Sequence, residues 1–550
     1  MKRIYIILFI CTISWSMHSQ LLTANSQKFN RADTLRGSLR VERTSYDVLS
    51  YGLDIKLNPD KRYIEGYNEI TFKVIEPTST IQIDLFKNMA VDSIVYNNKN
   101  LKYNREENAV FVTFQDVLKK DHTESLKFYY SGYPKVAKNA PWDGGFVFSK
   151  DTNGKHFIGV AVQGTGASLW YPNKDHQSDE PDFADIKVSV PDGLMNVSNG
   201  KFINKTSVGS NYTQWHWRVT YPINTYNITL NVGDYIHIED NYNGLSLDYY
   251  VLKENLEKAK KQFQQVKPMM SCFYEKFGDY PFPNDGFKLV ESPYLGMEHQ
   301  SAVAYGNNYE NGYLGTDLSA TGVGLKWDFI IIHESGHEWF GNSVSASDIA
   351  DMWIHESFTA YAEAVFVECE YGKKDAITYL HGLRKIIAND RPIIGEYGVN
   401  HEGSGDMYYK GANMLHTLRS VINDDSKWWH LLKEFHTKFK YKTIHTDDVI
   451  AFYDSQTDMA LQPIFDQYLN YTTPPTLQLK LNDEQQLLMK WKTDVDNFKM
   501  PVEFQDTSEG SILREMISNE WQVVGINLRT IEDLAINEFG FYIDVNFIED

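Results

Sequence analysis

The motif HESGH at 333–337, followed by Glu356, constrains this chain more than any other stretch. On a helix, two histidines four positions apart project from one face, so His333 and His337 can reach one ion. Glu356, nineteen positions after His337, can supply a third ligand from a following helix. Three protein ligands leave a fourth position open for water, which is typical of catalytic zinc rather than structural zinc. The motif therefore predicts one Zn²⁺ per chain, held by His333, His337 and Glu356.

The residues around the motif predict two buried helices, over 325–340 and 352–371. A pair of core histidines is the alternative interpretation. It leaves the carboxylates of Glu334 and Glu356 unpaired in an apolar setting, which costs free energy. Glu334 follows a ligand on a slightly rotated face of the helix. There it can take a proton from the attacking water as general base and deliver it to the leaving amine.

The hydrophobic period divides the chain into three parts. Alternation with period two runs from about 45 to 235, helical spacing follows to about 470, and period two returns after Pro475. With 550 residues the chain is also too long for one core. We therefore predict a multidomain α+β protein with an N-terminal antiparallel β domain (45–238), a mostly helical catalytic domain (239–471) and a small C-terminal β-sandwich (472–550). A long helix over 252–277, bent at Pro268, is expected within the catalytic domain.

The charge balance excludes some classes of partner. The formal net charge is −20, which argues against nucleic acid and against anionic membrane surfaces as partners. We attribute the acidity to solubility. No segment after the N-terminal region reaches eighteen consecutive apolar residues, so no membrane span is expected in the mature chain.

The N-terminus has the outline of a signal peptide over 1–19. A basic start, Met1-Lys2-Arg3, precedes an apolar run over 4–17 that is too short to span a membrane. Cys11 lies in this run, but Ile10 before it matches a lipoprotein cleavage site poorly, so a lipid anchor is the less favoured alternative. The protein is therefore expected to be secreted or periplasmic. Residues 20–44 are polar and are expected to form a loose leader.

The mature chain retains two cysteines, Cys272 and Cys369. Both lie in helical patterns and are far apart in sequence. We therefore expect two buried thiols and no disulfide.

Four motifs together resemble one family of enzymes. HESGHEWFGN at 333–342 resembles the HExxHxWFGN signature of the thermolysin-like zinc aminopeptidases, which include the membrane alanyl aminopeptidases and leukotriene hydrolase. WIHESFT at 353–359 is similar to the family's WLNEGFA, LGMEH at 295–299 to its GxMEN, and YYKG at 408–411 to its YxKG. The resemblance covers about 45–550 and implies a thermolysin-like catalytic domain. The implied activity is a zinc-dependent aminopeptidase that acts in peptide breakdown on peptides with a free N-terminus.

The resemblance also implies a substrate-binding set. Glu298 corresponds to the glutamate that holds the α-amino group of the substrate. Gln163 resembles a glutamine that lines the same subsite; a loop amide bonded to its own backbone is the alternative. The backbone of Gly296 and Met297 corresponds to the strand edge that contacts the peptide.

Two further roles are implied near the metal. Tyr408 corresponds to the tyrosine that donates the second hydrogen bond to the oxyanion, although the neighbouring Tyr409 makes the alignment sensitive to a shift of one residue. Glu363 matches a glutamate that can orient His333, with an ordinary helix-surface carboxylate as the alternative.

The chain departs from the family pattern at three places. In the GxMEN motif, Leu295 stands where the family has its first glycine and His299 where it has asparagine. In the family's NEG, His355 replaces the asparagine and Ser357 the glycine. The sequence ends after the small β domain, whereas many relatives continue into a large helical domain. We therefore expect a cleft that is more open to solvent and to longer peptides. A hydrolase of a different bond on the same scaffold, and a non-catalytic binding protein derived from it, are the alternative functions.

Overall fold

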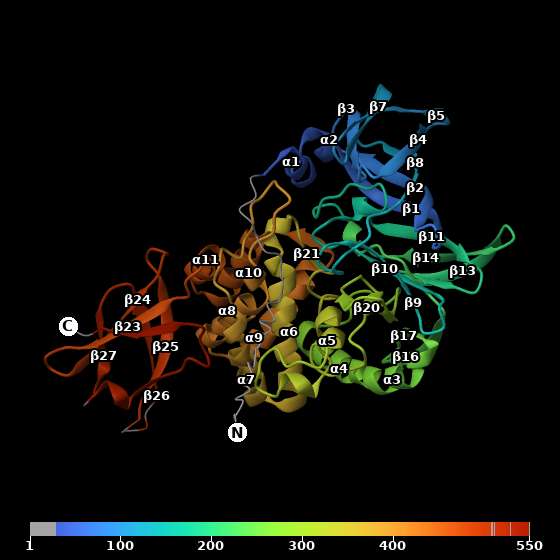
Figure 1. The fold of residues 1–550 in the computed structure, drawn as a ribbon. Coiled ribbons are helices and arrows are strands. Elements are labelled where there is room, and N and C mark those ends of the chain that lie inside the picture. Colours follow the sequence, from blue (N-terminus) through green and yellow to red (C-terminus); the bar gives the residue numbers. More distant parts are fainter. Residues whose placement is uncertain (1–28, 508–509, 511, 529, 549–550) are drawn as a thin grey trace, which may run out of the picture.

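The computed structural model describes residues 29–548, except 508–509, 511 and 529. The predicted signal peptide and the first part of the predicted leader lie outside the described residues. In Figure 1 the N-terminal β domain (blue to teal) and the C-terminal β domain (red) lie at opposite ends of the molecule, with the helical domain between them. The predicted multidomain α+β architecture is confirmed.

An eight-stranded sheet forms the frame of the N-terminal domain. Its order is β13-β14-β11-β1-β2-β8-β4-β5, and the pairs are antiparallel except β1 with β11. Alternate residues of β1, such as Leu53, Ile55 and Leu57, are buried as the period-two pattern predicts. The strands are β1 (Tyr46–Asn58), β2 (Tyr63–Val74), β4 (Met89–Tyr96), β5 (Lys99–Asn100), β8 (Thr123–Gly132), β11 (Phe183–Pro191), β13 (Lys201–Val208) and β14 (Tyr212–Val219).

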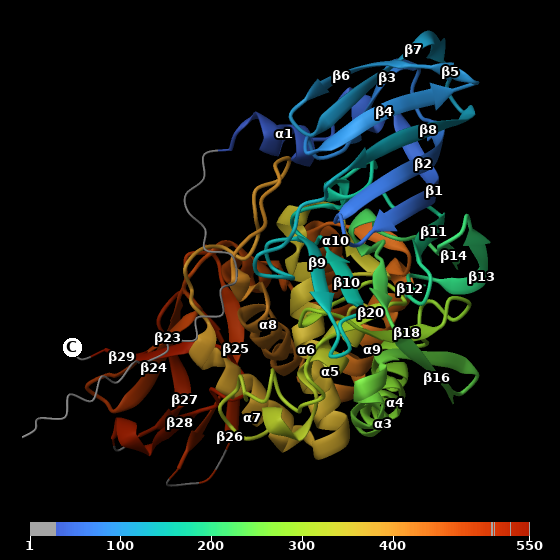
Figure 2. The ribbon, with the colours of Figure 1, turned by 45° about the vertical axis from the view of Figure 1, so that its right-hand side comes forward.

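Two smaller sheets complete this domain. One has the order β3-β7-β6, and the other, β12-β15-β10-β9, adjoins the catalytic domain (Figure 2). Their strands are β3 (Thr78–Asp84), β6 (Lys102–Glu106), β7 (Ala109–Leu118), β9 (Gly145–Lys150), β10 (His156–Ala161), β12 (Met195–Val197) and β15 (Asn231–Gly233). The residues after β10 carry Gln163 and form the short 3₁₀ turn η1 (Ala167–Leu169).

The catalytic domain opens with a five-stranded sheet of order β16-β17-β18-β20-β19. Its strands are β16 (Tyr235–Tyr242), β17 (Leu245–Leu252), β18 (Phe287–Glu291), β19 (Gly296–Met297) and β20 (Val303–Tyr305). This sheet begins at Tyr235, just before the predicted boundary. β19 lies at the edge of the sheet and pairs with β20 alone among the described strands.

The long helix predicted over 252–277 is divided into two. α3 (Leu256–Gln262) and α4 (Val266–Phe277) are separated by the 3₁₀ turn η4 (Phe263–Gln265). Pro268 has no N–H to donate to the carbonyl four residues earlier, so an α-helical hydrogen bond is missing at this point. The proline therefore lies in the first turn of a new helix, where it is tolerated.

Helices α5 and α6 form the centre of the helical part. Asp328 begins α5 by accepting hydrogen bonds from Ile330 N at 3.1 Å and Ile331 N at 3.2 Å, which satisfies two free amides of the first turn. α6 is buried from its first residue to Val367, and the ring of Phe358 stacks on Phe435 of α9 with centroids 4.8 Å apart. The helices are α5 (Phe329–Gly336), α6 (Trp353–Tyr371), α7 (Lys373–Leu383), α8 (Tyr409–Ile422), α9 (Asp425–Phe439), α10 (Thr446–Thr457) and α11 (Gln462–Asn470).

The C-terminal domain consists of two sheets, of order β27-β24-β23-β29 and β26-β25-β28. Trp491 lies between them, is 1% exposed and donates its indole N–H to Met500 O at 2.9 Å. The strands are β23 (Thr476–Leu481), β24 (Gln486–Lys492), β25 (Lys499–Asp506), β26 (Ile512–Ser518), β27 (Gln522–Asn527), β28 (Leu534–Ile536) and β29 (Asp544–Phe547).

The prediction of a loose leader is wrong for residues 29–44. They form α1 (Arg31–Gly37) and α2 (Val41–Thr44), and Leu35 and Arg43 are buried. Asn30 and Asp33 make a capping box at the start of α1. Tertiary contacts to the β domain, which local polarity does not reveal, order this segment.

The prediction of free thiols is also wrong, because Cys272 of α4 and Cys369 of α6 form a disulfide. Cys272 is buried, whereas Cys369 is exposed. The two residues are 97 positions apart in sequence, but α4 packs beside α6 and brings their Cα atoms to 6.0 Å. Sequence separation carries no information on such a contact.

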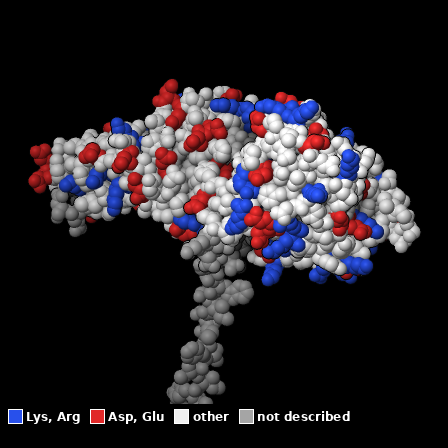
Figure 3. All heavy atoms as spheres, turned by 90° about the horizontal axis from the view of Figure 1, so that it is seen from above, with Lys and Arg blue, Asp and Glu red and all other residues white. Residues whose placement is uncertain are grey.

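The surface carries charges of both signs. Figure 3 shows acidic and basic side chains interspersed over the face seen there, despite the net charge of −20. Among the described residues, no helix is long and apolar enough to cross a membrane.

We predict that replacing both Cys272 and Cys369 by alanine lowers the stability of the protein by about 2–4 kcal/mol, because the disulfide restricts the unfolded chain. The measurement is the midpoint of denaturant unfolding, followed by circular dichroism. The wild-type protein in a reducing buffer serves as the control and should lose a similar amount. Equal midpoints for the wild-type protein with and without reductant would contradict the prediction.

Candidate active site

His333 and His337 point their Nε2 atoms toward one position. The two atoms are 3.3 Å apart, and both side chains are buried. Each opposite ring nitrogen has a partner: His333 Nδ1 lies 2.6 Å from Glu363 Oε1, and His337 Nδ1 lies 3.0 Å from Phe340 O. These contacts place the proton on Nδ1 of each ring and leave both Nε2 lone pairs free to bind an ion.

Glu356 of α6 completes this group. Its Oε2 lies 3.4 Å from His337 Nε2 and 3.7 Å from His333 Nε2. This buried oxygen accepts no hydrogen bond within the described part of the chain. Two imidazole nitrogens and one carboxylate oxygen within 4.8 Å of one another suit a divalent zinc ion, so the residues fit the metal that the sequence predicts.

Glu363 lies two turns after Glu356 on the same face of α6 and is fully buried. Its Oε2 accepts a hydrogen bond from Tyr379 OH at 2.7 Å, while Oε1 holds His333. The helix-surface alternative is therefore excluded by its burial. Tyr379, on α7, had no motif to mark it in the sequence.

Glu298 lies close to His337, just after the edge strand β19, and is 2% exposed. Its Oε1 accepts hydrogen bonds from Gln163 Nε2 at 2.6 Å and from Tyr226 OH at 3.0 Å. Gln163 Nε2 also lies 3.1 Å from Glu356 Oε1, so one amide joins the two carboxylates. The loop alternative for Gln163 does not hold, because its side chain points into this cluster. Tyr226 was not predicted, since an isolated tyrosine in an irregular segment gives no sequence signal.

Glu334 faces the same space from α5. It groups with Glu298 and His337, with the nearest ligand atoms within 4.8 Å of one another. Burial raises the pKa of Glu334 to about 7. A Cβ atom at Gly296 would lie 2.7 Å from Glu334 Oε1, so any side chain there would displace this carboxylate. Met297, the other residue of β19, is buried and pairs with Ala304.

Tyr408, rather than Tyr409, faces the metal-binding group. Its ring stacks on His333 with centroids 5.9 Å apart. Burial and then the carboxylates of Glu356 and Glu298 raise the pKa of Tyr408 well above its ordinary value. The pKa of Tyr409 is also raised, first by burial and then by the carboxylate of Glu363. Glu363 lies on the other side of His333.

Close packing of α8 on α6 places Tyr408. A Cβ atom at Gly411 would lie 1.8 Å from Ser357 Oγ, so the helices can approach this closely only with glycine there. Ser357 Oγ donates to Met407 O at 2.6 Å and fixes the residue before Tyr408. Lys410 donates to Tyr471 O at 2.8 Å and to Thr472 O at 3.0 Å, which ties the same helix to the start of the C-terminal domain.

His299 and His355, which flank Glu298 and Glu356 in the two motifs, are neutral core residues. Burial lowers the pKa of His299 to about 3, and burial likewise lowers that of His355 to about 3. His355 Nε2 accepts a hydrogen bond from Ala346 N at 2.8 Å. Both ring nitrogens of His299 lack hydrogen bonds to any residue that the structure describes.

Two family models match the chain and together cover more than half of it. The peptidase M1 N-terminal domain matches residues 45–227, and the peptidase family M1 domain matches residues 261–468. The second match spans both predicted helices of the metal site and the tyrosine pair at 408–409.

Individual relatives agree with these models. Aminopeptidase N of Lactobacillus helveticus is 23% identical over 80% of this chain and 53% of its own length. Aminopeptidase M1-D of Oryza sativa subsp. japonica is 23% identical over 68% of this chain and 45% of its own length. The chain thus spans about half the length of these curated relatives.

A solved structure shares the fold over almost its whole length. A mutant M1 zinc metallopeptidase from Deinococcus radiodurans, bound to a Tyr-Ser-Ala substrate, superposes with a TM-score of 0.65 and 20% identity. The match covers 79% of this chain and 96% of that chain. With both domain models matched in order and this fold in common, the chain belongs to peptidase family M1.

Proposed function

We propose that this chain is a zinc-dependent aminopeptidase, which hydrolyses the N-terminal peptide bond of peptides. The observation that carries the proposal is the position of Glu298, a buried carboxylate within the same small cluster as His337 and Glu334. A carboxylate there favours a substrate whose charged α-amino group lies next to the scissile bond. Such a group limits hydrolysis to the first residue of a peptide.

The ion would be held by His333, His337 and Glu356, with Glu363 orienting His333. When bound, zinc polarises the scissile carbonyl and lowers the pKa of water. Glu334 takes the proton from the attacking water and passes it to the leaving amine. Tyr408 donates its hydroxyl hydrogen to the oxyanion that develops on the carbonyl.

The peptide backbone would be oriented by β19. This strand is at the edge of its sheet, so the backbone groups of Gly296 and Met297 that do not bond to β20 can pair with an extended peptide. Gly296 leaves the space beside Glu334 open. The N-terminal residue of the substrate would then extend toward Glu298, with Gln163 and Tyr226 fixing that carboxylate.

We also propose an exported location, secreted or periplasmic. The apolar run near the N-terminus supports export. The disulfide between Cys272 and Cys369 supports it independently, because disulfides persist mainly in oxidising compartments.

Glu334→Gln should retain one zinc per chain and lose activity by about 10²–10⁴-fold, because the amide cannot accept the proton. The measurements are kcat on an aminoacyl p-nitroanilide and metal content by atomic absorption. Chelation of the wild-type protein, followed by zinc, serves as the control and should abolish and restore activity. Full activity in the variant would refute the general-base role.

Glu298→Gln should raise KM for peptides with a free N-terminus by about 10- to 100-fold, since a hydrogen bond to a charged group is lost. The same peptides with an acetylated N-terminus serve as the control, and their slow hydrolysis should not fall further. If the ratio between free and acetylated substrates stays that of the wild-type protein, Glu298 is not the amine anchor.

Tyr408→Phe should lower kcat by about 10²–10³-fold, as expected for loss of one oxyanion donor. Tyr409→Phe is the matched control, because its hydroxyl faces the Glu363 side, and it should keep near-normal kcat. A large loss in the control with normal activity in Tyr408→Phe would transfer the role to Tyr409.

A further inference from the structure

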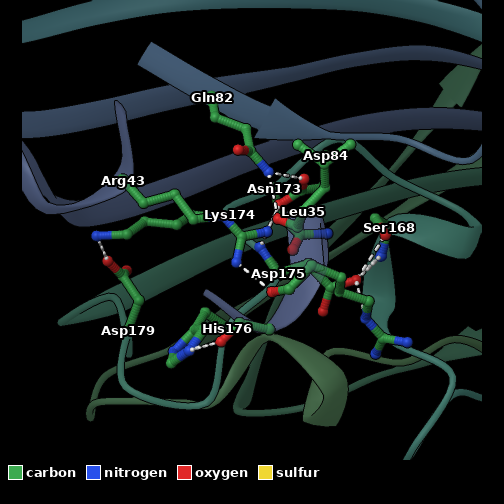
Figure 4. A network of polar contacts seen from close by, with 12 residues as sticks. Leu35, Arg43, Gln82, Asp84, Ser168, Asn173, Lys174, Asp175, His176 and Asp179 are labelled. Atoms are coloured by element: carbon green, nitrogen blue, oxygen red, sulfur yellow. Dashed lines mark hydrogen bonds and ion pairs between the residues drawn. The ribbon is translucent and has the colours of Figure 1, made fainter. Parts of the chain in front are cut away.

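The segment 29–44, here called the N-terminal arm, is fastened to the β domain at both ends. Near its start, Arg31 donates to Glu106 through Nε at 2.7 Å and Nη2 at 3.1 Å. At its other end, the buried Arg43 pairs with Asp84 and donates to Arg36 O. Figure 4 shows Arg43, Asp84 and Gln82 in one polar network, and Gln82 Nε2 donates to Leu35 O at 2.9 Å.

The middle of the arm lies against the turn that carries Gln163. A Cβ atom at Gly166 would lie 2.2 Å from Arg36 Nη2, so the guanidinium rests directly on the backbone of this turn. Arg36 Nε is 3.7 Å from Asp175 Oδ2. The same oxygen accepts hydrogen bonds from Ser168 N at 3.2 Å and Ser168 Oγ at 2.5 Å (Figure 4). Arg36 thereby contacts the turn directly at Gly166 and, through Asp175, contacts Ser168 two positions later.

The end of α1 contacts the catalytic domain. A Cβ atom at Gly37 would lie 2.1 Å from the carbonyl carbon of Val399, so the two backbones touch. Phe29 packs edge-on against His401, with ring centroids 5.1 Å apart. Figures 1 and 2 both show α1 beside this loop, which leads into Tyr408.

Gly37 is held in this position by His176. Burial lowers the pKa of His176 to about 3, so the ring is neutral. Its Nδ1 accepts a hydrogen bond from Ser178 N at 3.2 Å, which leaves the proton on Nε2. His176 Nε2 then donates to Gly37 O at 3.3 Å.

The arm lines a small cavity together with the turn that carries Gln163 and with Tyr226. Its lining includes Arg36, Gly37, Val162, Gly164, Tyr226 and Asn400. Tyr226 is the residue that donates to Glu298. The arm is therefore linked to Glu298 through a residue that lines the same cavity, Tyr226.

The turn that carries Gln163 contains two glycines. Gly164 and Gly166 have φ of +68° and +96°, a region that favours glycine. Gly166 N donates to Val162 O at 2.6 Å within the turn, and the packing of Arg36 on Gly166 adds to this bond. Gln163, between the strand β10 and these glycines, must nevertheless keep its amide on both Glu298 and Glu356.

We propose that Arg36 is a positioning residue for Gln163, and that the N-terminal arm, by packing on the turn that carries Gln163, sets the selectivity for a free α-amino group. This inference rests on the proposed aminopeptidase function. It assigns a substrate-selecting role to a segment outside both matched domains, because the first of the two matches begins at residue 45.

The test compares Arg36→Ala with Arg31→Ala, two arginines of the same short helix. Arg36→Ala should raise KM for leucine p-nitroanilide, and the Kd for L-leucine by calorimetry, about tenfold. Its kcat and its weak binding of N-acetyl-L-leucine should stay near the wild-type values. Arg31→Ala, which removes only an exposed pair with Glu106, should leave KM and Kd unchanged.

Gly37→Ala supplies a second variant that keeps every charge. Its added methyl group displaces the loop at Val399, so it should shift KM and Kd in the same direction as Arg36→Ala. Thermal midpoints of all three variants identify any general loss of stability. Wild-type KM and Kd in both Arg36→Ala and Gly37→Ala, or equal effects of Arg36→Ala and Arg31→Ala, would overturn the inference.

The binding measurement separates this inference from the proposed function. A wild-type protein that prefers L-leucine over its acetylated form but shows no turnover would refute the aminopeptidase activity alone. The Kd of Arg36→Ala would then still decide the role of the arm. A wild-type protein with neither turnover nor this preference would refute both.

Discussion

Several buried carboxylates must coexist around two imidazoles, and the rest of the catalytic architecture depends on how their charges are compensated. An isolated buried charge is costly, so each carboxylate needs a donor or an ion. Glu363 has His333 and Tyr379, and Glu298 has Gln163 and Tyr226. These donors come from α5, from α7, from the turn after β10 and from the 3₁₀ turn Thr225–Asn227 before β15. The electrostatics of one small volume therefore tie together segments that are remote in sequence.

The sequence was informative wherever a pattern repeats or a motif has fixed spacing. Helical spacing located α5 and α6, and HESGH with Glu356 identified the three residues whose ligand atoms converge. Residues that act through tertiary contact alone could not be found. Tyr226 and Tyr379 lie in no motif, and the pairing of Cys272 with Cys369 depends on the packing of α4 beside α6. The arm was misjudged for the same reason, since its polarity resembles that of an unstructured leader while its order comes from partners such as Asp84 and Asp175.

The substitution of serine at 357 shows how a motif can change without disturbing its site. A side chain at this position meets α8, and Gly411 provides the space that it needs. The serine hydroxyl then bonds to Met407 O, next to the tyrosine that faces the metal ligands. The pair Ser357 and Gly411 thus acts as a unit in which one residue makes room for the other. His299 differs, because its buried ring forms no hydrogen bond to any described residue, and its physical role is packing.

The position of Gln163 determines which part of the chain can be separated without loss of the site. It belongs to the N-terminal β domain, yet its amide lies between two carboxylates of the catalytic domain. A catalytic domain joined to an unrelated β domain would keep all three metal ligands but would leave Glu298 and Glu356 facing each other without a shared donor. The functional module is therefore larger than the helical domain, because a catalytic domain keeps this arrangement only beside a β domain that supplies such an amide.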